Sequence, residues 1–380
     1  PRPAARQPKN SKPDTSHLPL SPCPPALLPY CPASPRSPPD PPATMTSFPT
    51  MAALTRISDL SEKPFDITPL DRSEWANGDY VVAEVVETSR RTQIELPTGR
   101  MIELTVGDCL VGAFGVRTAT LEAVGSWQEI GEDFHLQAMT AAGLFGKITS
   151  LSSFIHKPME LVYRGHATRG GSKVTMGDFV ATQRPAEFNF PILLLIGTSM
   201  SSGKTTSARI IIRRLKRMGL RVVGAKLTGA GRYRDVLSMS DAGADAIFDF
   251  VDVGLPSSVC DAETYRTALF NLLARITNEK PDVLVAEAGA SPLEPYNGET
   301  ALEVIHPKVR CTVLCASDPY AVVGVTKGFG FEPDLVAGLA TSTSAGVEVV
   351  RRLAGKPALN LLNRESYDEL DQLLIKQLMI

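Results

Sequence analysis

The sequence predicts an α/β protein in which a C-terminal parallel-sheet domain, residues 190–380, follows a smaller β-rich domain, residues 66–185. Strand-like and helix-like segments alternate in the C-terminal half, in the order that a parallel sheet requires. Short apolar runs between turn residues dominate the β-rich part. Residues 1–50 are rich in proline and serine, and we expect a disordered tail because such a segment builds neither helices nor interior strands.

This tail is expected to lie outside the working protein. The chain begins with Pro1, and both Met45 and Met51 precede the first globular pattern. One hypothesis is that residues 1–50 are translated upstream sequence or the end of a fragment. Removing them should then change neither activity nor stability.

Composition narrows the classes of partner. Of the 380 residues 43% are hydrophobic and 21% charged, and the formal net charge is −2. A nearly neutral chain without a strongly basic half argues against nucleic acid as the main partner. No apolar run approaches the length of a membrane span, so we expect a cytoplasmic protein without a membrane partner. The expected partner is a small-molecule substrate. The six cysteines fit neither a disulfide framework nor a zinc pattern, and Cys311 and Cys315 are expected in the core.

The first predicted strands belong to the β-rich domain. Residues 80–86 and 92–96 have strand character, and residues 97–100 form a turn that leads into a third strand at 101–106. Short strands of this kind are typical of a small barrel or sandwich.

Two similar phrases recur in this domain, Thr-Val-Gly-Asp-Cys-Leu at 105–110 and Thr-Met-Gly-Asp-Phe-Val at 175–180. Each has the pattern of a strand, a Gly-Asp turn and a second strand, so weak internal duplication and coincidence both stay open. Residues 139–147 and 163–171 place glycine beside basic residues. Either segment could contact an anionic ligand, but a solvated turn is the favoured interpretation.

The C-terminal domain opens with a strand at 192–196, followed by a helix whose apolar residues recur with a helical period between positions 208 and 215. Gly219 is a natural stop for that helix. Asp261 is the expected N-cap of a later helix. The remaining predicted strands are 221–226, 283–286, 309–316, 335–339 and 357–362, and the remaining helices are 261–278, 344–353 and a closing helix that contains Tyr367 and Leu370.

The strand 192–196 runs directly into Gly-Thr-Ser-Met-Ser-Ser-Gly-Lys-Thr-Thr, which predicts a phosphate-binding loop. Backbone N–H groups of such a glycine turn surround a polyphosphate, and the next helix presents its positive N-terminal end to the same anion. Lys204 would reach the terminal phosphates, and the Thr205 hydroxyl would bind Mg²⁺. The expected nucleotide-binding residues of the loop are Gly197, Thr198, Ser201, Ser202, Gly203, Lys204, Thr205 and Thr206.

Five residues separate Gly197 from Gly203, where the usual motif has four. This longer loop resembles that of dethiobiotin synthetase and its relatives among cobyrinic acid and molybdopterin-cofactor enzymes, a class of P-loop NTPases. The resemblance implies that Lys226, at the end of the second strand, faces the γ-phosphate and the substrate. It also implies a homodimer, because sites of this class are often completed at a dimer interface.

The strand 283–286 delivers Glu287 into a loop of small residues. Mg²⁺ needs a hard carboxylate oxygen opposite the Thr205 hydroxyl, and Glu287 is placed to supply it. The relatives carry Glu-Gly-Ala-Gly here, whereas this chain has Glu-Ala-Gly-Ala. This chain therefore keeps the acid of the relatives but not their glycine pattern.

An acidic stretch lies between the second and third of these strands. Asp245, Asp249 and Asp252 are spaced so that a helix would place the first two on one face, near the third. They could bind a second metal or the amine of a substrate. A solvated acidic loop that caps a helix is the other interpretation.

Two more polar residues follow strands of the predicted sheet. Asp318 comes after the strand 309–316, at the edge where ligands collect, and is the acid to test as a catalytic residue after Glu287. Asn360 lies in the last predicted strand, where the resemblance implies an amide side chain that reads the nucleotide base.

The C-terminal half also looks like the P-loop domain of proteins related to a D-glutamate N-acetyltransferase, which pair it with a comparable N-terminal domain. Three functions follow. The leading one is a Mg²⁺-dependent enzyme that uses ATP to activate a small carboxylate or to phosphorylate a small molecule. The second is an N-acyltransferase acting on an amino acid, whose loop would hold a nucleotide-bearing acyl carrier. The third is a nucleotide-switched binding protein whose affinity for a partner differs between its ATP and ADP states.

Overall fold

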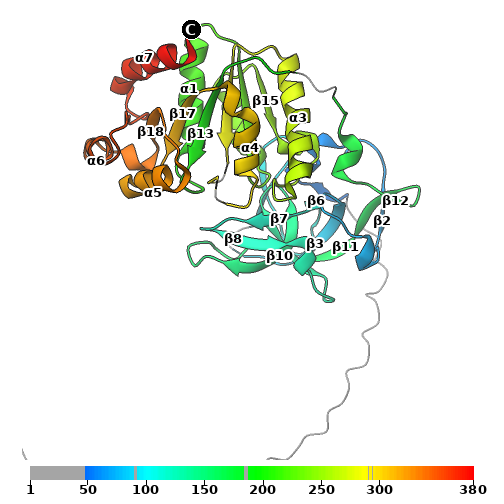
Figure 1. Ribbon diagram of the computed structural model, residues 1–380. Coiled ribbons are helices and arrows are strands. Elements are labelled where there is room, and N and C mark those ends of the chain that lie inside the picture. Colours follow the sequence, from blue (N-terminus) through cyan, green and yellow to red (C-terminus); the bar gives the residue numbers. More distant parts are fainter. Residues whose placement is uncertain (1–47, 90–91, 184–186, 290, 293) are drawn as a thin grey trace, which may run out of the picture. The chain divides into compact units, whose positions relative to one another are not determined.

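The C-terminal half of the chain folds around a six-stranded sheet, drawn in Figure 1 from the computed structural model. Residues 48–380 are described, except residues 90–91, 184–186, 290 and 293. The predicted disordered tail therefore lies almost wholly outside the described residues. Its last residue, Thr50, already belongs to a strand, β1 (Thr50–Met51).

Every strand of the sheet runs parallel to its neighbours. The strands are β13 (Ile192–Gly197), β14 (Val222–Thr228), β15 (Ala246–Asp249), β16 (Val283–Ala288), β17 (Val309–Cys315) and β18 (Leu335–Ala337). Their order is β15-β14-β16-β13-β17-β18. The carboxyl ends of all six strands therefore lie at one edge, which is where open α/β sheets bind ligands.

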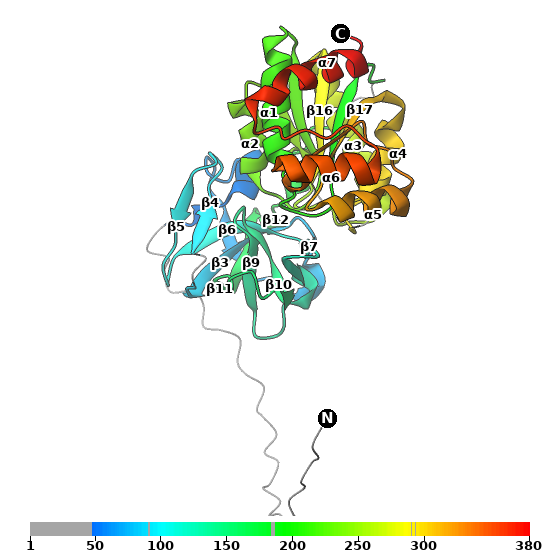
Figure 2. The ribbon, with the colours of Figure 1, turned by 90° about the vertical axis from the view of Figure 1, so that its left-hand side faces the viewer.

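Helices cover both faces of the sheet. They are α1 (Lys204–Arg217), α2 (Tyr233–Asp241), α3 (Ala262–Asn278), α4 (Gly298–Ile305), α5 (Pro319–Phe329), α6 (Ser344–Ala354) and α7 (Tyr367–Leu378). Because side chains alternate along a strand, Leu193 and Leu195 pack with α1, α2 and α7, while Ile192 and Leu194 pack with α3 and α4 on the other face. Figure 1 shows α1 and α3 on either side of the strands. Helices α5 and α6 pack against each other (Figure 2). In the described part of the chain, no helix combines the length and the apolar character that crossing a membrane would require.

The β-rich part is a ten-stranded sheet, and five of its strands close into a barrel. Its strands are β1, β2 (Asp66–Thr68), β3 (Tyr80–Glu87), β6 (Cys109–Phe114), β7 (Val116–Thr118), β8 (Ala123–Ser126), β9 (His135–Thr140), β10 (Leu144–Leu151), β11 (Glu160–Arg169) and β12 (Ser172–Lys173). The ring runs β6-β3-β11-β9-β10 and closes where Phe145 of β10 pairs with Phe114 of β6. A separate hairpin, β4 (Gln93–Glu95) and β5 (Met101–Glu103), follows β3 (Figure 2). The barrel is one of the two architectures that the sequence predicts, and the α/β fold class is confirmed.

The barrel and the parallel sheet share one apolar core. Tyr80 and Val82 of β3 belong to the same buried cluster as Leu194 of β13 and Ala225 of β14. All described residues accordingly fall within one unit of the chain. The β-rich part is thus packed against the sheet rather than tethered to it, and it can supply one wall of a shared site.

The two recurring phrases share a turn rather than a duplicated hairpin. In each, the threonine N–H donates to the aspartate carboxylate three residues later, at 2.7 Å for Thr105 to Asp108 and 2.7 Å for Thr175 to Asp178. The first phrase leads into β6, but residues 176–179 of the second form a 3₁₀ turn, so the strand prediction is wrong there. The likeness reflects local capping chemistry.

Two further predictions in the C-terminal domain are wrong. Residues 246–249 form the edge strand β15, so Asp245 and Asp249 do not share a helix face. Residues 357–362 are not a strand, because only Ala358 forms a bridge, to Val336 of β18. By contrast, the N-cap prediction for Asp261 is confirmed. Helix α3 begins directly after Asp261, whose carboxylate accepts the Thr264 N–H at 2.9 Å.

The acids of this stretch are held by cations. Asp245 pairs with Lys216 of α1 at 2.7 Å. The guanidinium of Arg56, from the β-rich part, lies 2.6 Å from Asp249 and 2.9 Å from Asp252. Nowhere among the described residues do three or more His, Cys, Asp or Glu side chains gather as metal ligands. The structure therefore favours ion pairs over a second metal at these acids.

Asp252 should make stability depend on pH. Burial, and then the neighbouring Asp249 carboxylate, raise the pKa of Asp252 from 3.8 to about 6. The folded chain then holds this proton more tightly than the unfolded chain, so the free energy of unfolding should fall as pH rises from about 4 to about 6. A shift of this size corresponds to about 1–3 kcal/mol after allowance for screening.

The measurement is the free energy of unfolding of the wild type and of Asp252→Asn across this pH range. The difference between the two proteins should change with pH in the stated direction. Parallel curves would contradict the prediction.

Candidate functional site

The phosphate loop lies at the carboxyl edge of the central strand β13, and α1 begins directly at Lys204. Gly203 has φ +102°, a left-handed conformation that glycine adopts without strain. A Cβ there would also lie 3.1 Å from Gly338 Cα, a tight contact that adds to the preference for glycine at this position. Within the described atoms, the buried Ser202 hydroxyl has no hydrogen-bond partner.

Lys204 is folded back into the loop. Its side chain is buried, and its Nζ donates to the Ser199 carbonyl at 2.8 Å. Gly197 makes room for it, since a Cβ at Gly197 would lie 2.6 Å from that nitrogen. Burial lowers the pKa of Lys204, although the nearby Glu287 carboxylate acts in the opposite direction. The ammonium is thus short of anionic partners, which is the state that a bound phosphate would relieve.

Thr205 and Glu287 form a pair of oxygen donors next to this lysine. The Thr205 hydroxyl lies 3.2 Å from one oxygen of the Glu287 carboxylate and 3.4 Å from the other. Burial, and then the charge of Asp235, raise the pKa of Glu287, against the effects of Lys204 and Lys226. A hydroxyl and a carboxylate are ligands that Mg²⁺ prefers, and a dication would offset the buried negative charge. These residues therefore fit a magnesium ion.

Lys226 lies beside Glu287 in the sheet, because the two residues are register partners on the neighbouring strands β14 and β16. Its Nζ lies 2.5 Å from the Asp235 carboxylate of α2. Burial acts to lower the pKa of Lys226, but Asp235 and Glu287 outweigh it and raise the pKa. Gly289 leaves space for this side chain, since a Cβ there would lie 2.7 Å from Lys226 Cε. Lys226 is therefore a charged, buried lysine in a fixed position.

The first turn of α2 carries further charges and is held by the β-rich part. The buried Glu95 carboxylate of β4 accepts the backbone N–H groups of Tyr233 at 3.1 Å and Arg234 at 2.6 Å. No side chain of α2 or of its N-cap residue, Arg232, performs this capping. Glu95 is thus a helix cap supplied from another part of the fold.

Glu95→Gln should therefore destabilise the chain. Glutamine keeps the length of the side chain but offers one acceptor oxygen where the carboxylate offers two, so one buried N–H of α2 loses its partner. We expect the free energy of unfolding to fall by about 1–2 kcal/mol in chemical denaturation. Glu103→Gln, an exposed acid on the same hairpin, is the matched control and should have no such effect. Equal stabilities of the two variants would argue against the cap.

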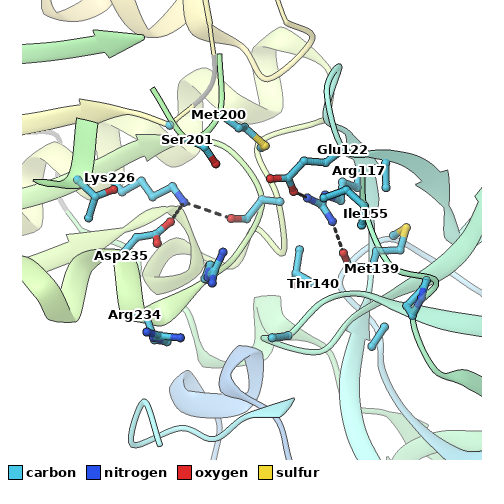
Figure 3. A pocket seen from close by; sticks show the side chains of 18 of the residues that line it. Arg117, Glu122, Met139, Thr140, Ile155, Met200, Ser201, Lys226, Arg234 and Asp235 are labelled. Carbon is cyan, nitrogen blue, oxygen red and sulfur yellow. Dashed lines mark hydrogen bonds and ion pairs between the residues drawn. The ribbon is translucent and has the colours of Figure 1, made fainter. Parts of the chain in front are cut away.

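The charged residues of this edge line one cavity of about 510 Å³. Figure 3 shows its two walls, with Lys226, Arg234 and Asp235 on one side and Arg117, Glu122, Met139 and Ile155 on the other. The second wall comes from the β-rich part. Its residues are Gln93, Met101, Arg117, Glu122, Ala123, Ala138, Met139, Thr140, Ala141, Ile148, Leu151, Ile155, Pro158 and Met159.

Arg117 and Glu122 form an ion pair within that wall, and the Nε of Arg117 has no hydrogen-bond partner among the described atoms. The Arg117 guanidinium donates to the Glu122 carboxylate and to the Met139 carbonyl. Arg117 is buried, and the pair carries no net charge. It therefore shapes the wall without attracting an anion strongly.

The structure brings most of the predicted site residues to this cavity. The cavity is lined by Ser201, Gly203, Lys204, Thr205, Thr206, Lys226 and Glu287. Gly197 and Ser202 belong to the same loop but do not line the cavity.

The other predicted residues do not line the cavity. Thr198 accepts the Ser317 N–H at 3.0 Å, and the Asp318 carboxylate caps α5 through the N–H groups of Tyr320 and Ala321. The Asn360 side chain donates to the Ser342 carbonyl at 3.0 Å. Base reading by Asn360 and catalysis by Asp318 stay predictions.

Sequence reasoning missed Arg117, Glu122, Arg234 and Asp235 as site residues. One signal was present for the last two, because they follow the loop at the carboxyl end of β14. The barrel residues had none, since only the folded barrel brings them to the loop. The favoured interpretation of residues 139–147, a solvated turn, also needs correction. Met139, Thr140 and Ala141 of this segment line the cavity.

The C-terminal domain is a P-loop NTPase domain by its parallel strand order, its phosphate loop and the helix that begins at the loop lysine. No protein-family model and no curated protein matches the chain. Among solved structures the chain is similar to chloroplast FtsY from Physcomitrella patens, with 15% identity, a TM-score of 0.32 and coverage of 47% of this chain and 61% of that one.

Two other similar structures have comparable scores. The hydrogenase maturation factor HypB from Archaeoglobus fulgidus has 15% identity, a TM-score of 0.35 and coverage of 50% of this chain and 90% of that one. A duf1611 family protein from Anabaena variabilis has 16% identity, a TM-score of 0.35 and coverage of 55% and 66%. The chain spans 58–61% of the length of the FtsY structures it matches. Because these TM-scores are low, the fold assignment rests on the strand order and the loop.

Proposed function

We propose that this chain binds a nucleoside triphosphate with Mg²⁺ at the phosphate loop and transfers its terminal phosphoryl group to a small molecule. The observation that carries the proposal is the cavity itself. Loop residues Lys204 and Thr205 and barrel residues such as Met139 line the same space. A cavity of about 510 Å³ that extends from the loop onto a second wall has room for an acceptor beside the phosphates.

Each buried group has a defined task in this proposal. Lys204 leaves the Ser199 carbonyl to pair with the terminal phosphates, and Lys226 offsets the charge that develops during transfer. Thr205 and Glu287 hold the magnesium ion. Bound Mg²⁺ supplies Lewis-acid polarisation of the phosphate oxygens.

The transfer needs no further reagent when the acceptor oxygen is already an anion, and a hydroxyl acceptor also releases its proton to solvent or buffer. An oxygen of the acceptor forms a bond to the γ-phosphorus, and the bond from that phosphorus to the β,γ-bridging oxygen breaks. The bridging oxygen keeps the electron pair and leaves on the nucleoside diphosphate. Homodimeric assembly, a cytoplasmic location and the choice between ATP and GTP stay predictions.

The test is nucleotide turnover by the full chain in the presence of a panel of small organic acids and alcohols. We expect nucleoside diphosphate release that requires Mg²⁺ and rises when an acceptor is added, together with a phosphorylated acceptor detectable by ³¹P NMR. Slow hydrolysis that no acceptor stimulates, combined with a partner protein that binds only one nucleotide state, would favour a switch instead.

A further inference from the structure

Several ionisable side chains of the cavity already neutralise one another. Among the described residues that line it, Arg117 pairs with Glu122, and Lys226 pairs with Asp235 at 2.5 Å. Each of these pairs carries no net charge. The charge balance of the cavity therefore depends on its other ionisable side chains. These are Lys204, Glu287, Arg232 and Arg234.

A bound nucleotide would leave this balance negative if the two arginines took no part. A nucleoside triphosphate with its Mg²⁺ keeps about two negative charges, and the ionised Glu287 carboxylate adds about one more. Lys204 offsets only part of this charge. Uncompensated charge next to buried groups costs free energy, so further cations are needed here. Arg232 and Arg234 supply positive charge in the amount that is missing.

The guanidinium groups of Arg232 and Arg234 are available for this role. Both residues are exposed, and within the described chain neither guanidinium forms a hydrogen bond or an ion pair. A guanidinium is planar and presents several N–H donors, which match the oxygens of a phosphoryl group in a bidentate manner. The two arginines are thus unpaired cations that share a cavity with the phosphate loop.

The main chain at these arginines is held by the β-rich part. The Glu95 carboxylate accepts the Arg234 N–H at 2.6 Å, and the Thr140 hydroxyl of β9 donates to the Gly231 carbonyl at 3.1 Å. Because Glu95 already occupies N–H groups at the start of α2, an anion here would meet the arginine side chains rather than the helix N-terminus. Only the side chains need to turn towards the nucleotide.

We infer that Arg232 and Arg234 bind the terminal phosphoryl group of the nucleotide and stay with it during transfer, as arginine fingers supplied by the same chain. This inference rests on the proposed function and adds two catalytic residues to it. Neither arginine forms or breaks a covalent bond. The acceptor oxygen bonds to the γ-phosphorus, the bond to the β,γ-bridging oxygen breaks, and the guanidinium groups stabilise the charge on the oxygens of the transferred group.

The test compares two nucleotides that differ in the terminal phosphoryl group. ADP and β,γ-imido-ATP are each titrated calorimetrically into the full chain with Mg²⁺, or GDP and β,γ-imido-GTP if the wild type prefers guanine. In Arg232→Gln/Arg234→Gln, the affinity for the triphosphate analogue relative to that for the diphosphate should fall at least about 30-fold. Each single variant should show part of this loss. Mg²⁺-dependent nucleotide turnover by the double variant should fall at least about 100-fold.

The matched control is Arg213→Gln/Arg217→Gln, which removes two exposed arginines of α1 that do not line the described cavity. It changes the net charge of the chain by the same amount, and its nucleotide preference should stay within about twofold of the wild type. Arg232→Lys/Arg234→Lys keeps the charge but loses the planar fork, so it should recover only part of the affinity. Melting curves should show that all variants are folded, because no side chain of α2 or of Arg232 caps the helix.

The outcomes separate the inference from the proposed function. If the wild type binds both nucleotides and Arg232→Gln/Arg234→Gln keeps its preference, or loses both affinities equally, the inference is overturned and the proposed function stands. If the α1 control shows the same loss, the effect belongs to overall charge and the inference is overturned as well. If the wild type binds neither nucleotide with Mg²⁺, the proposed function fails and the inference fails with it.

Discussion

Replacing Lys204 with methionine is expected to weaken binding of Mg²⁺ and ATP at least about 50-fold, because the bound phosphates lose a buried ammonium and its charged hydrogen bonds. Methionine keeps most of the apolar length of the lysine, so the packing of the loop should survive. The measurement is isothermal titration calorimetry of the two full-length proteins with ATP in the presence of Mg²⁺.

The control for this variant is Arg213→Ala, which removes an exposed positive charge from the same helix. It should bind ATP with nearly wild-type affinity, because exposed charges more than a Debye length apart are largely screened. Wild-type affinity in Lys204→Met would remove the basis for a phosphate site at this loop.

Glu287→Gln is expected to abolish the Mg²⁺ dependence of ATP binding. Glutamine has nearly the same shape but carries no charge, so the metal site loses its carboxylate while the loop keeps its lysine. Affinity with Mg²⁺ should fall about 30-fold, to a level that removing the metal does not lower further. The melting temperature should stay equal or rise, since burial raises the pKa of Glu287 and thereby disfavours its charged form.

The pH dependence of the same site has a predicted sign. Because the pKa of Glu287 is raised, acid should protonate it, and so weaken Mg²⁺-dependent binding, at a higher pH than an exposed glutamate would require. Glu287→Gln should lack this pH dependence. Glu348→Gln, an exposed acid on α6, should behave as the wild type in both measurements, and a similar loss in that variant would contradict the assignment.

The nucleotide half of the site could be predicted from the sequence because its signals are local. An apolar strand, a glycine loop and a periodic helix lie within about 25 consecutive residues, and each constrains the next. Glu287 is distant in sequence, but parallel strands bring their carboxyl ends to one edge, so the acid that follows a buried strand could be placed beside Thr205.

The barrel wall of the cavity could not be predicted, because long-range packing creates it. Glu95 caps α2 from a hairpin more than a hundred residues earlier, and this contact leaves no pattern in the residues of α2 itself. The helix was missed for the same reason, since neither its N-cap residue nor its short length signals a start. The local sequence does not distinguish Met139 and Ile155 from other apolar residues of the β-rich part. Only the fold places them in the wall of the cavity that contains the loop.

Errors in the C-terminal domain arise where two patterns compete. The acids around β15 have a helical spacing, but the strand between them pairs in parallel with β14, and its flanking carboxylates pair with Lys216 and Arg56. The apolar run at 357–362 has strand character, yet it lies at the edge beyond β18 and keeps a single bridge. In both cases, whether the segment forms a strand depends on its position at the edge of the sheet. Local sequence does not encode that position.

The most direct test of the nucleotide site is a calorimetric titration of the full chain with ATP, GTP and acetyl-CoA in turn, each with and without Mg²⁺. The proposed function predicts binding of a nucleoside triphosphate that is strengthened by Mg²⁺ and no comparable binding of acetyl-CoA. Acetyl-CoA binding without any response to ATP or GTP would contradict the proposed function and favour acyl transfer.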